Sequence, residues 1–141
     1  MAATTAQIRA ALALPLTNHY GALSPAWNVS AYYVSKPEPP QFDLTAGAII
    51  FDTAQARGSD DIRYILRAVV ALSLDVVAQQ QMDMLIDTTS ADAVKTVMEA
   101  DRTLGGVVAA IRVADVTEVK LYGTAGGSEL PGVEFTIQVW P

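Results

Sequence analysis

The chain has 141 residues, nine of them basic and fifteen acidic, so its formal net charge is −6. This length indicates one domain, residues 1–141, with enough chain to bury a real core. The acidic balance argues against sequence-specific binding of DNA or RNA, and the absence of cysteine excludes disulfides, thiol nucleophiles and zinc–cysteine sites.

The first predicted element is a helix of about ten residues. Thr4 and Gln7 have the spacing of a capping box, in which each side chain satisfies a backbone N–H of the first turn. Ile8, Ala11 and Leu12 then share one face. Pro15 is expected to end the helix, because proline removes an interior hydrogen bond. Residues 16–27 are predicted to be a loop.

Two strand candidates follow, separated by a proline-rich connector. Val29–Val34 is rich in β-branched and aromatic residues, and Ala48–Asp52 is a second short candidate. Between them, Lys36–Pro40 must be extended, because each proline fixes its own φ and restricts its predecessor. The segment is interpreted as a stiff connector, with a ligand for a polyproline-binding partner as the alternative.

Ile62–Leu74 fits two patterns. As a strand, it separates an apolar face from one that carries Arg63, Arg67 and Ser73. As a helix, it aligns Ile62, Ile65, Leu66, Val69 and Leu72. Gly58 lies in a turn between two apolar runs, which favours a hairpin and therefore a strand. The predicted inward face of that strand consists of Tyr64, Leu66, Ala68, Val70, Leu72 and Leu74.

Two helices are predicted next. Asp75 can cap a helix that runs to about Asp87, and Ser90 or Asp92 can open another that ends before Gly105-Gly106. Residues 75–101 hold six acidic side chains and one basic side chain, so the outer face of this helix pair is expected to be acidic. The predicted buried positions are Ala78, Met82, Leu85, Ile86, Val94, Val97 and Met98.

Two further strands close the chain. Ile111–Tyr122 alternates but slips near Asp115, which predicts a β-bulge, and Val133–Trp140 alternates without a break. The predicted fold is therefore α+β: a single domain with a mixed or antiparallel sheet of about four to five strands packed against two to three helices.

No group of residues has the pattern of a catalytic or metal site. His19 is the only histidine, and a triad with Ser24 and Asp43 lacks a nucleophile elbow. The carboxylate pairs Asp60/Asp61 and Asp83/Asp87 fall in a turn and on a polar helix face, where both members would ionise. Neither an enzymatic activity nor a cofactor nor a bound metal is expected.

The composition indicates contact with other subunits instead. Hydrophobic residues make up 51% of the chain and charged residues 17%, against roughly 25% charged residues in an average domain. Trp140 lies on the polar side of the last strand, where an aromatic side chain is typical of an interface or of packing within the subunit. The longest apolar stretch, Ile62–Val77, is too short and too charged to span a bilayer, and no signal peptide is visible.

Four segments of the second half share the pattern of a known family: Met98-Glu-Ala-Asp101-Arg102-Thr-Leu104-Gly105-Gly106, the Ile111-Arg-Val113 strand, the Tyr122-Gly123 turn and the closing Val133–Val139 strand. Together they resemble tail terminator (tail completion) proteins of long-tailed bacteriophages. The similarity is greatest to the versions found in phages of actinobacteria. The early helix, the proline-rich connector and the strand with Arg63 occur in matching order, so the resemblance covers most of the chain.

This resemblance implies a subunit of a homo-oligomeric, six-fold ring that caps the tail tube, stops its polymerisation and presents a surface to the head-side connector or stopper protein. The implied partners are other copies of the chain, the tail tube protein and that connector, with DNA passing through the lumen without specific binding. The implied location is the phage tail or neck in the virion, after assembly in the host cytoplasm.

Ring closure needs two different patches on each subunit. We expect Arg57, Arg63 and Arg67 to meet the acidic helix pair with Asp83 and Asp87 on a neighbour, and Trp140 to be a further interface candidate. Two alternatives remain: another neck component, such as a stopper or adaptor, and a monomeric enzyme or small-molecule binding domain.

Overall fold

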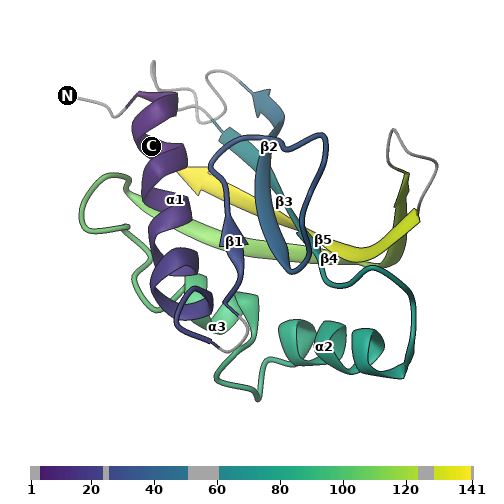
Figure 1. Ribbon diagram of the computed structural model, residues 1–141. Coiled ribbons are helices and arrows are strands. Elements are labelled where there is room, and N and C mark those ends of the chain that lie inside the picture. The colour runs from purple at the N-terminus through teal and green to yellow at the C-terminus, as the bar shows by residue number, and fades with distance from the viewer. Residues whose placement is uncertain (1–3, 24–25, 51–60, 124–128, 141) are drawn as a thin grey trace.

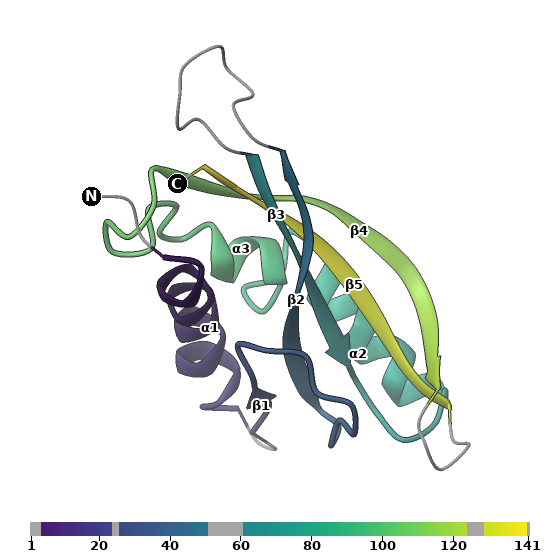
Figure 2. The ribbon, with the colours of Figure 1, turned by 90° about the horizontal axis from the view of Figure 1, so that it is seen from above.

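The structure is a computed structural model that describes residues 4–23, 26–50, 61–123 and 129–140. A five-stranded sheet with the order β1-β2-β3-β5-β4 carries helices on one side (Figures 1 and 2). The predicted α+β class and the predicted order of elements are confirmed. The elements are α1 (Thr5–Tyr20), β1 (Asn28–Val29), β2 (Gln41–Ile50), β3 (Asp61–Val69), α2 (Val76–Ile86), α3 (Val94–Met98), β4 (Ala110–Gly123) and β5 (Glu129–Trp140).

Helix α1 begins as predicted, with both hydrogen bonds of the capping box between Thr4 and Gln7. It does not end at Pro15 but continues to Tyr20. The proline removes one backbone bond, yet the extra turns bury Leu16 and Tyr20 completely. With Ile8 and Leu12 these residues form a stripe spaced by four positions, so tertiary packing offsets the break that the local sequence predicts.

Successive residues of each strand point alternately to the core face and to the outer face of the sheet. β2, β3, β5 and β4 pair antiparallel, and β1 pairs parallel to β2. In β5 the alternation is the predicted one, since every second residue from Val133 to Val139 is buried against the helices. The outer-facing positions between them are half-buried Glu134, Thr136 and Gln138.

β3 is a strand, as predicted, but it ends at Val69 rather than at Leu74. Its last partners are Gln41 in β2 and Gly132 in β5. The next residue of β5 along this ladder is Pro131, which has no N–H to donate. Pro131 accepts one further hydrogen bond, from Val70 N–H at 2.9 Å, and the chain then leaves the sheet.

The first two strands differ from their predicted bounds. β1 contains only Asn28–Val29, because Ser30 turns the chain: its hydroxyl accepts from the Tyr32 N–H at 3.2 Å. β2 begins at Gln41, directly after the proline connector, and so includes residues 48–50 of the predicted second strand. Residues 51–52 of that prediction lie outside the described residues.

β4 contains the predicted bulge, since its register against β5 shifts between Val113 and Asp115. A second shift lies between Thr117 and Lys120. Further along, Gly132 of β5 is tightly enclosed: a Cβ there would lie 2.3 Å from Ala68 O and 2.8 Å from the Tyr122 ring. Only glycine allows this close approach of β3 and the tyrosine.

α2 begins as predicted, with the Asp75 carboxylate accepting from Ala78 N–H at 2.8 Å. Ala78, Met82 and Leu85 are buried as predicted, whereas Ile86 is only half-buried. α3 is shorter than predicted and ends at Met98, well before the two glycines. The intervening turns place Leu104, Gly105 and Gly106 at φ values of 51°, 69° and 89°. The glycines therefore serve a left-handed turn into β4 rather than the end of the helix.

Candidate functional site

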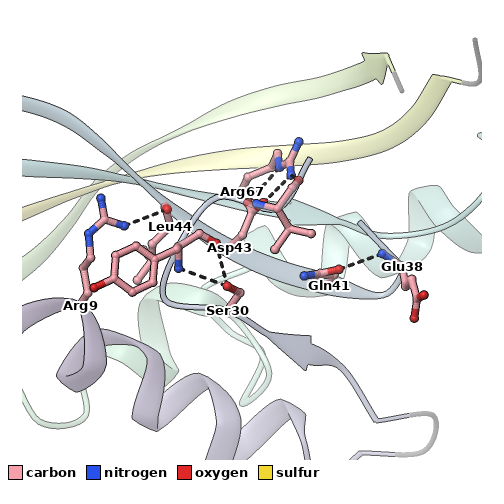
Figure 3. A network of polar contacts seen from close by, with 9 residues as sticks. Arg9, Ser30, Glu38, Gln41, Asp43, Leu44 and Arg67 are labelled. Carbon is pink, nitrogen blue, oxygen red and sulfur yellow. Dashed lines mark hydrogen bonds and ion pairs between the residues drawn. The ribbon is translucent and has the colours of Figure 1, made fainter. Parts of the chain in front are cut away.

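A buried ion pair joins β2 and β3 on the outer face of the sheet (Figure 3). Arg67 Nε donates to Asp43 Oδ1 at 2.9 Å, and Nη2 donates to Asp43 Oδ2 and, at 2.7 Å, to Val34 O. Val34 N–H in turn donates to Asp43 Oδ2 at 2.9 Å. The Arg67 and Asp43 side chains are 8% and 1% exposed. The pair therefore ties the loop before β2 to the sheet.

Two tyrosines cover Arg67. Its guanidinium carbon lies 4.6 Å from the Tyr33 ring centroid and 5.2 Å from that of Tyr122, distances typical of cation–π contacts. Burial, together with the nearby Glu134 carboxylate, raises the pKa of Tyr122. The cavity beside this cluster has a volume of about 310 Å³. Since Arg67 is paired with Asp43, we assign the cluster a structural role.

His19 does not approach Asp43, the triad partner considered above. Its Nε2 lies 2.7 Å from Asp92 Oδ1, and the neighbouring Tyr20 hydroxyl donates to Asp92 O. These contacts join the end of α1 to the turn before α3. Ser24, the third member considered for a triad, lies outside the described residues.

Glu99, at the end of α3, is the centre of a second polar network. Its carboxylate accepts from Lys95, from Arg102 Nη2 at 2.8 Å and from Val113 N–H at 3.1 Å, and its side chain is 8% exposed. Burial alone would raise its pKa, but these hydrogen bonds and the two cations lower the pKa overall. The network fixes the turn after α3 against β4.

We predict that Glu99→Gln destabilises the protein at neutral pH and that the difference from wild type shrinks in acid. A pKa lower in the folded than in the unfolded state stabilises the fold above the unfolded value, 4.5, and this stabilisation disappears as pH falls through the folded value. Urea denaturation at several pH values measures it. Glu38→Gln, at an exposed site, is the control. A difference that stays constant below pH 4.5 would contradict the prediction.

The described residues contain no group of three or more histidine, aspartate or glutamate side chains that could hold a metal ion. Within the same ranges, none of the helices has both the length and the apolar character needed to cross a membrane. Asp83 on α2 and Asp87, the C-cap of that helix, are both exposed, as predicted. Asp87 accepts from the Thr89 N–H at 2.9 Å and from its hydroxyl at 2.8 Å.

An exposed apolar segment extends from the connection after β3 into the first turn of α2. We define it as Leu72, Leu74, Val76 and Val77, whose exposed fractions are 76%, 46%, 67% and 61%. Leu72 and Leu74 were expected to face the core, which is wrong because β3 ends before them. The sequence signal for this early end of β3 was Pro131 in β5, because a proline has no N–H to continue the hydrogen bonding between the two strands. Four large apolar side chains so exposed within six residues are typical of an interaction surface.

An apolar groove lies between α1 and the turns that follow α3, with a volume of about 910 Å³. Ala10, Ala11 and Leu14 form its α1 wall, and Val97, Met98 and Val107 line the opposite wall. Leu14 is 59% exposed. The sequence did not predict this groove, because the predicted first helix had a single apolar face and ended at Pro15.

The basic patch expected from three arginines is not formed by all of them. Arg63 is exposed on the outer face of the sheet, whereas Arg67 is buried with Asp43 and so provides no exposed charge for a neighbour. Arg57 lies outside the described residues. Trp140 is 37% exposed at the end of β5, paired with Ala110.

No model of a known protein family matches the sequence, and no curated protein matches it either. What the chain does is therefore inferred from its own surfaces and from the resemblance described above.

Proposed function

We propose that this chain is a structural, non-enzymatic subunit that assembles with copies of itself into a ring. From the resemblance of its sequence, we further propose that the ring is a tail terminator of a long-tailed bacteriophage. In this role it caps the tail tube, stops polymerisation and provides the joining surface for the head-side connector, while DNA passes through the lumen. The neck of the virion is the proposed location.

The observation that carries the proposal is the exposed apolar segment. Covering a fully exposed valine or leucine contributes about 1.5–3 kcal/mol, so four side chains of this exposure represent roughly 4–7 kcal/mol of unused burial. A subunit that works alone gains nothing from leaving this surface in water. A subunit that joins copies of itself recovers that free energy on assembly.

The test is whether the protein caps tail tubes. Tube protein of the parent phage is polymerised with and without this chain, and tube lengths and ends are recorded by electron microscopy. We expect shorter tubes with a ring at one end. Tubes that elongate unchanged in the presence of the protein would refute the terminator role, and rings that bind only the portal side would identify a stopper or adaptor.

A variant connects this activity to the exposed apolar segment. Leu72→Asp/Val76→Asp is expected to weaken assembly by at least about 30-fold, since it removes roughly 2 kcal/mol of burial and adds charge. Gln80→Asp/Thr88→Asp adds the same charge at exposed positions on and just after α2 without removing apolar surface, and serves as the matched control. Sedimentation measures both variants. Equal weakening would mean that charge, and not apolar contact, decides assembly.

A further inference from the structure

The groove and the exposed apolar segment are located at opposite ends of the molecule. In both views α1 and the turns after α3 lie on one side, and the connection from β3 into α2 lies on the other (Figures 1 and 2). The segment therefore cannot reach the groove of its own chain. Only a second molecule can bring the two together.

Charge favours a second copy of this chain as that molecule. With a net charge of −6, two copies repel each other wherever their acidic side chains meet. Residues 70–82 carry one charge, Asp75, and the groove lining carries one, Asp101. Both carboxylates already accept backbone N–H groups of their own chain, from Ala78 at 2.8 Å and from Gly105 at 2.8 Å. These charge-poor surfaces are where two copies approach at least electrostatic cost.

The size of the two surfaces sets the strength of the contact. The exposed apolar segment offers roughly 150–300 Å² of apolar surface, and a groove of about 910 Å³ can admit several aliphatic side chains. Even with the groove wall included, the area that this contact would bury is below the roughly 1,200 Å² of a standard stable interface. The contact therefore belongs to the transient class, which suits a subunit held in place by ring closure.

The β4 edge of the sheet is a competing surface on the described part of the chain; the opposite edge consists of the two residues of β1 and the part of β2 that β1 does not pair. β4 lies at the edge, but its register shifts twice, between Val113 and Asp115 and between Thr117 and Lys120. Bulges of this kind twist an edge strand away from regular pairing with another chain. Side-chain docking is thus better supported than extension of the sheet along β4.

We infer that the exposed apolar segment of one subunit inserts into the α1–α3 groove of the next. This inference rests on the proposed function and names the surfaces that the ring would use. Each subunit contributes the segment at one end and the groove at the other, so the contact is heterologous and propagates head to tail. The cross-subunit neighbours expected at its centre are Leu74 and Leu14.

Disulfide cross-linking tests the contact directly, because the chain has no cysteine of its own. Leu74→Cys and isotopically labelled Leu14→Cys are mixed as full-length proteins under mild oxidation and analysed by intact mass. We expect a mixed dimer at twice the 15.0 kDa chain mass. The control mixes Leu74→Cys with Asp115→Cys, an exposed site on the outer face of β4. We expect about tenfold less mixed dimer from this control pair.

The outcomes separate this contact from the proposed function. A mixed dimer no more abundant than the control, at any protein concentration, overturns the contact. If wild-type protein still caps tubes in that case, the ring exists but uses other surfaces. If the mixed dimer forms while tubes elongate past the wild-type protein, the contact stands and the terminator role fails. Circular dichroism confirms that each variant is folded.

Discussion

Replacing Asp43 with alanine is expected to lower the free energy of unfolding by about 3–5 kcal/mol. The substitution leaves the Arg67 guanidinium buried between two tyrosine rings without its carboxylate. An uncompensated buried charge is among the most destabilising changes that one substitution can make. It also releases Val34 N–H, so the loop before β2 loses its attachment. Urea denaturation followed by circular dichroism measures the loss.

The double variant Asp43→Leu/Arg67→Met is the matched comparison. It removes both charges and keeps apolar volume in the same place, so we expect it to retain much of the stability that Asp43→Ala loses. If both variants were destabilised equally, packing rather than the unpaired charge would explain the effect. Arg67→Met alone should also be destabilised by about 3–5 kcal/mol, because it leaves the Asp43 carboxylate buried without its cation.

Leu12→Ala is expected to destabilise the protein by about 2–5 kcal/mol, because it opens a cavity in the core. Leu12 is fully buried at the middle of the α1 stripe. A domain of this size has about 5–15 kcal/mol of stability in total, so a large share is lost. Thermal and urea denaturation measure the change.

Leu14→Ala provides the control on the same helix. It is the same substitution two residues away, at a side chain that is 59% exposed in the groove, so we expect a change of no more than about 0.5 kcal/mol. A large loss at Leu14 would mean that the groove is filled within the subunit. That result would also remove the space that the inferred contact between copies requires.

Local patterns predicted most of the elements. The capping box at Thr4 and the Asp75 cap are formed by side chains three residues from their backbone partners, so the sequence contains both members. The alternation of β5 and the slip at Asp115 follow from the two-residue period of a strand. The same period placed Arg67 on the outer face.

The errors arose where distant residues decide the outcome. α1 passes through Pro15 because Tyr20 packs against Trp27 and Phe42, with ring centroids 5.9 and 4.8 Å away. β3 stops at Val69 because its neighbour in β5 reaches Pro131, more than sixty positions later. The pattern of apolar residues within one segment does not show which distant residues will contact that segment.

The sequence alone thus determined the α+β class, the order of elements, the alternating faces of the last strand and the acidic, cysteine-free character of the chain. Only the tertiary structure decided that Arg67 is paired inside with Asp43, that Leu72–Val77 is exposed, and that α1 and the turns after α3 enclose a groove. The physical reason is that exposure and pairing are properties of contacts between segments, whereas capping and alternation are properties of one segment.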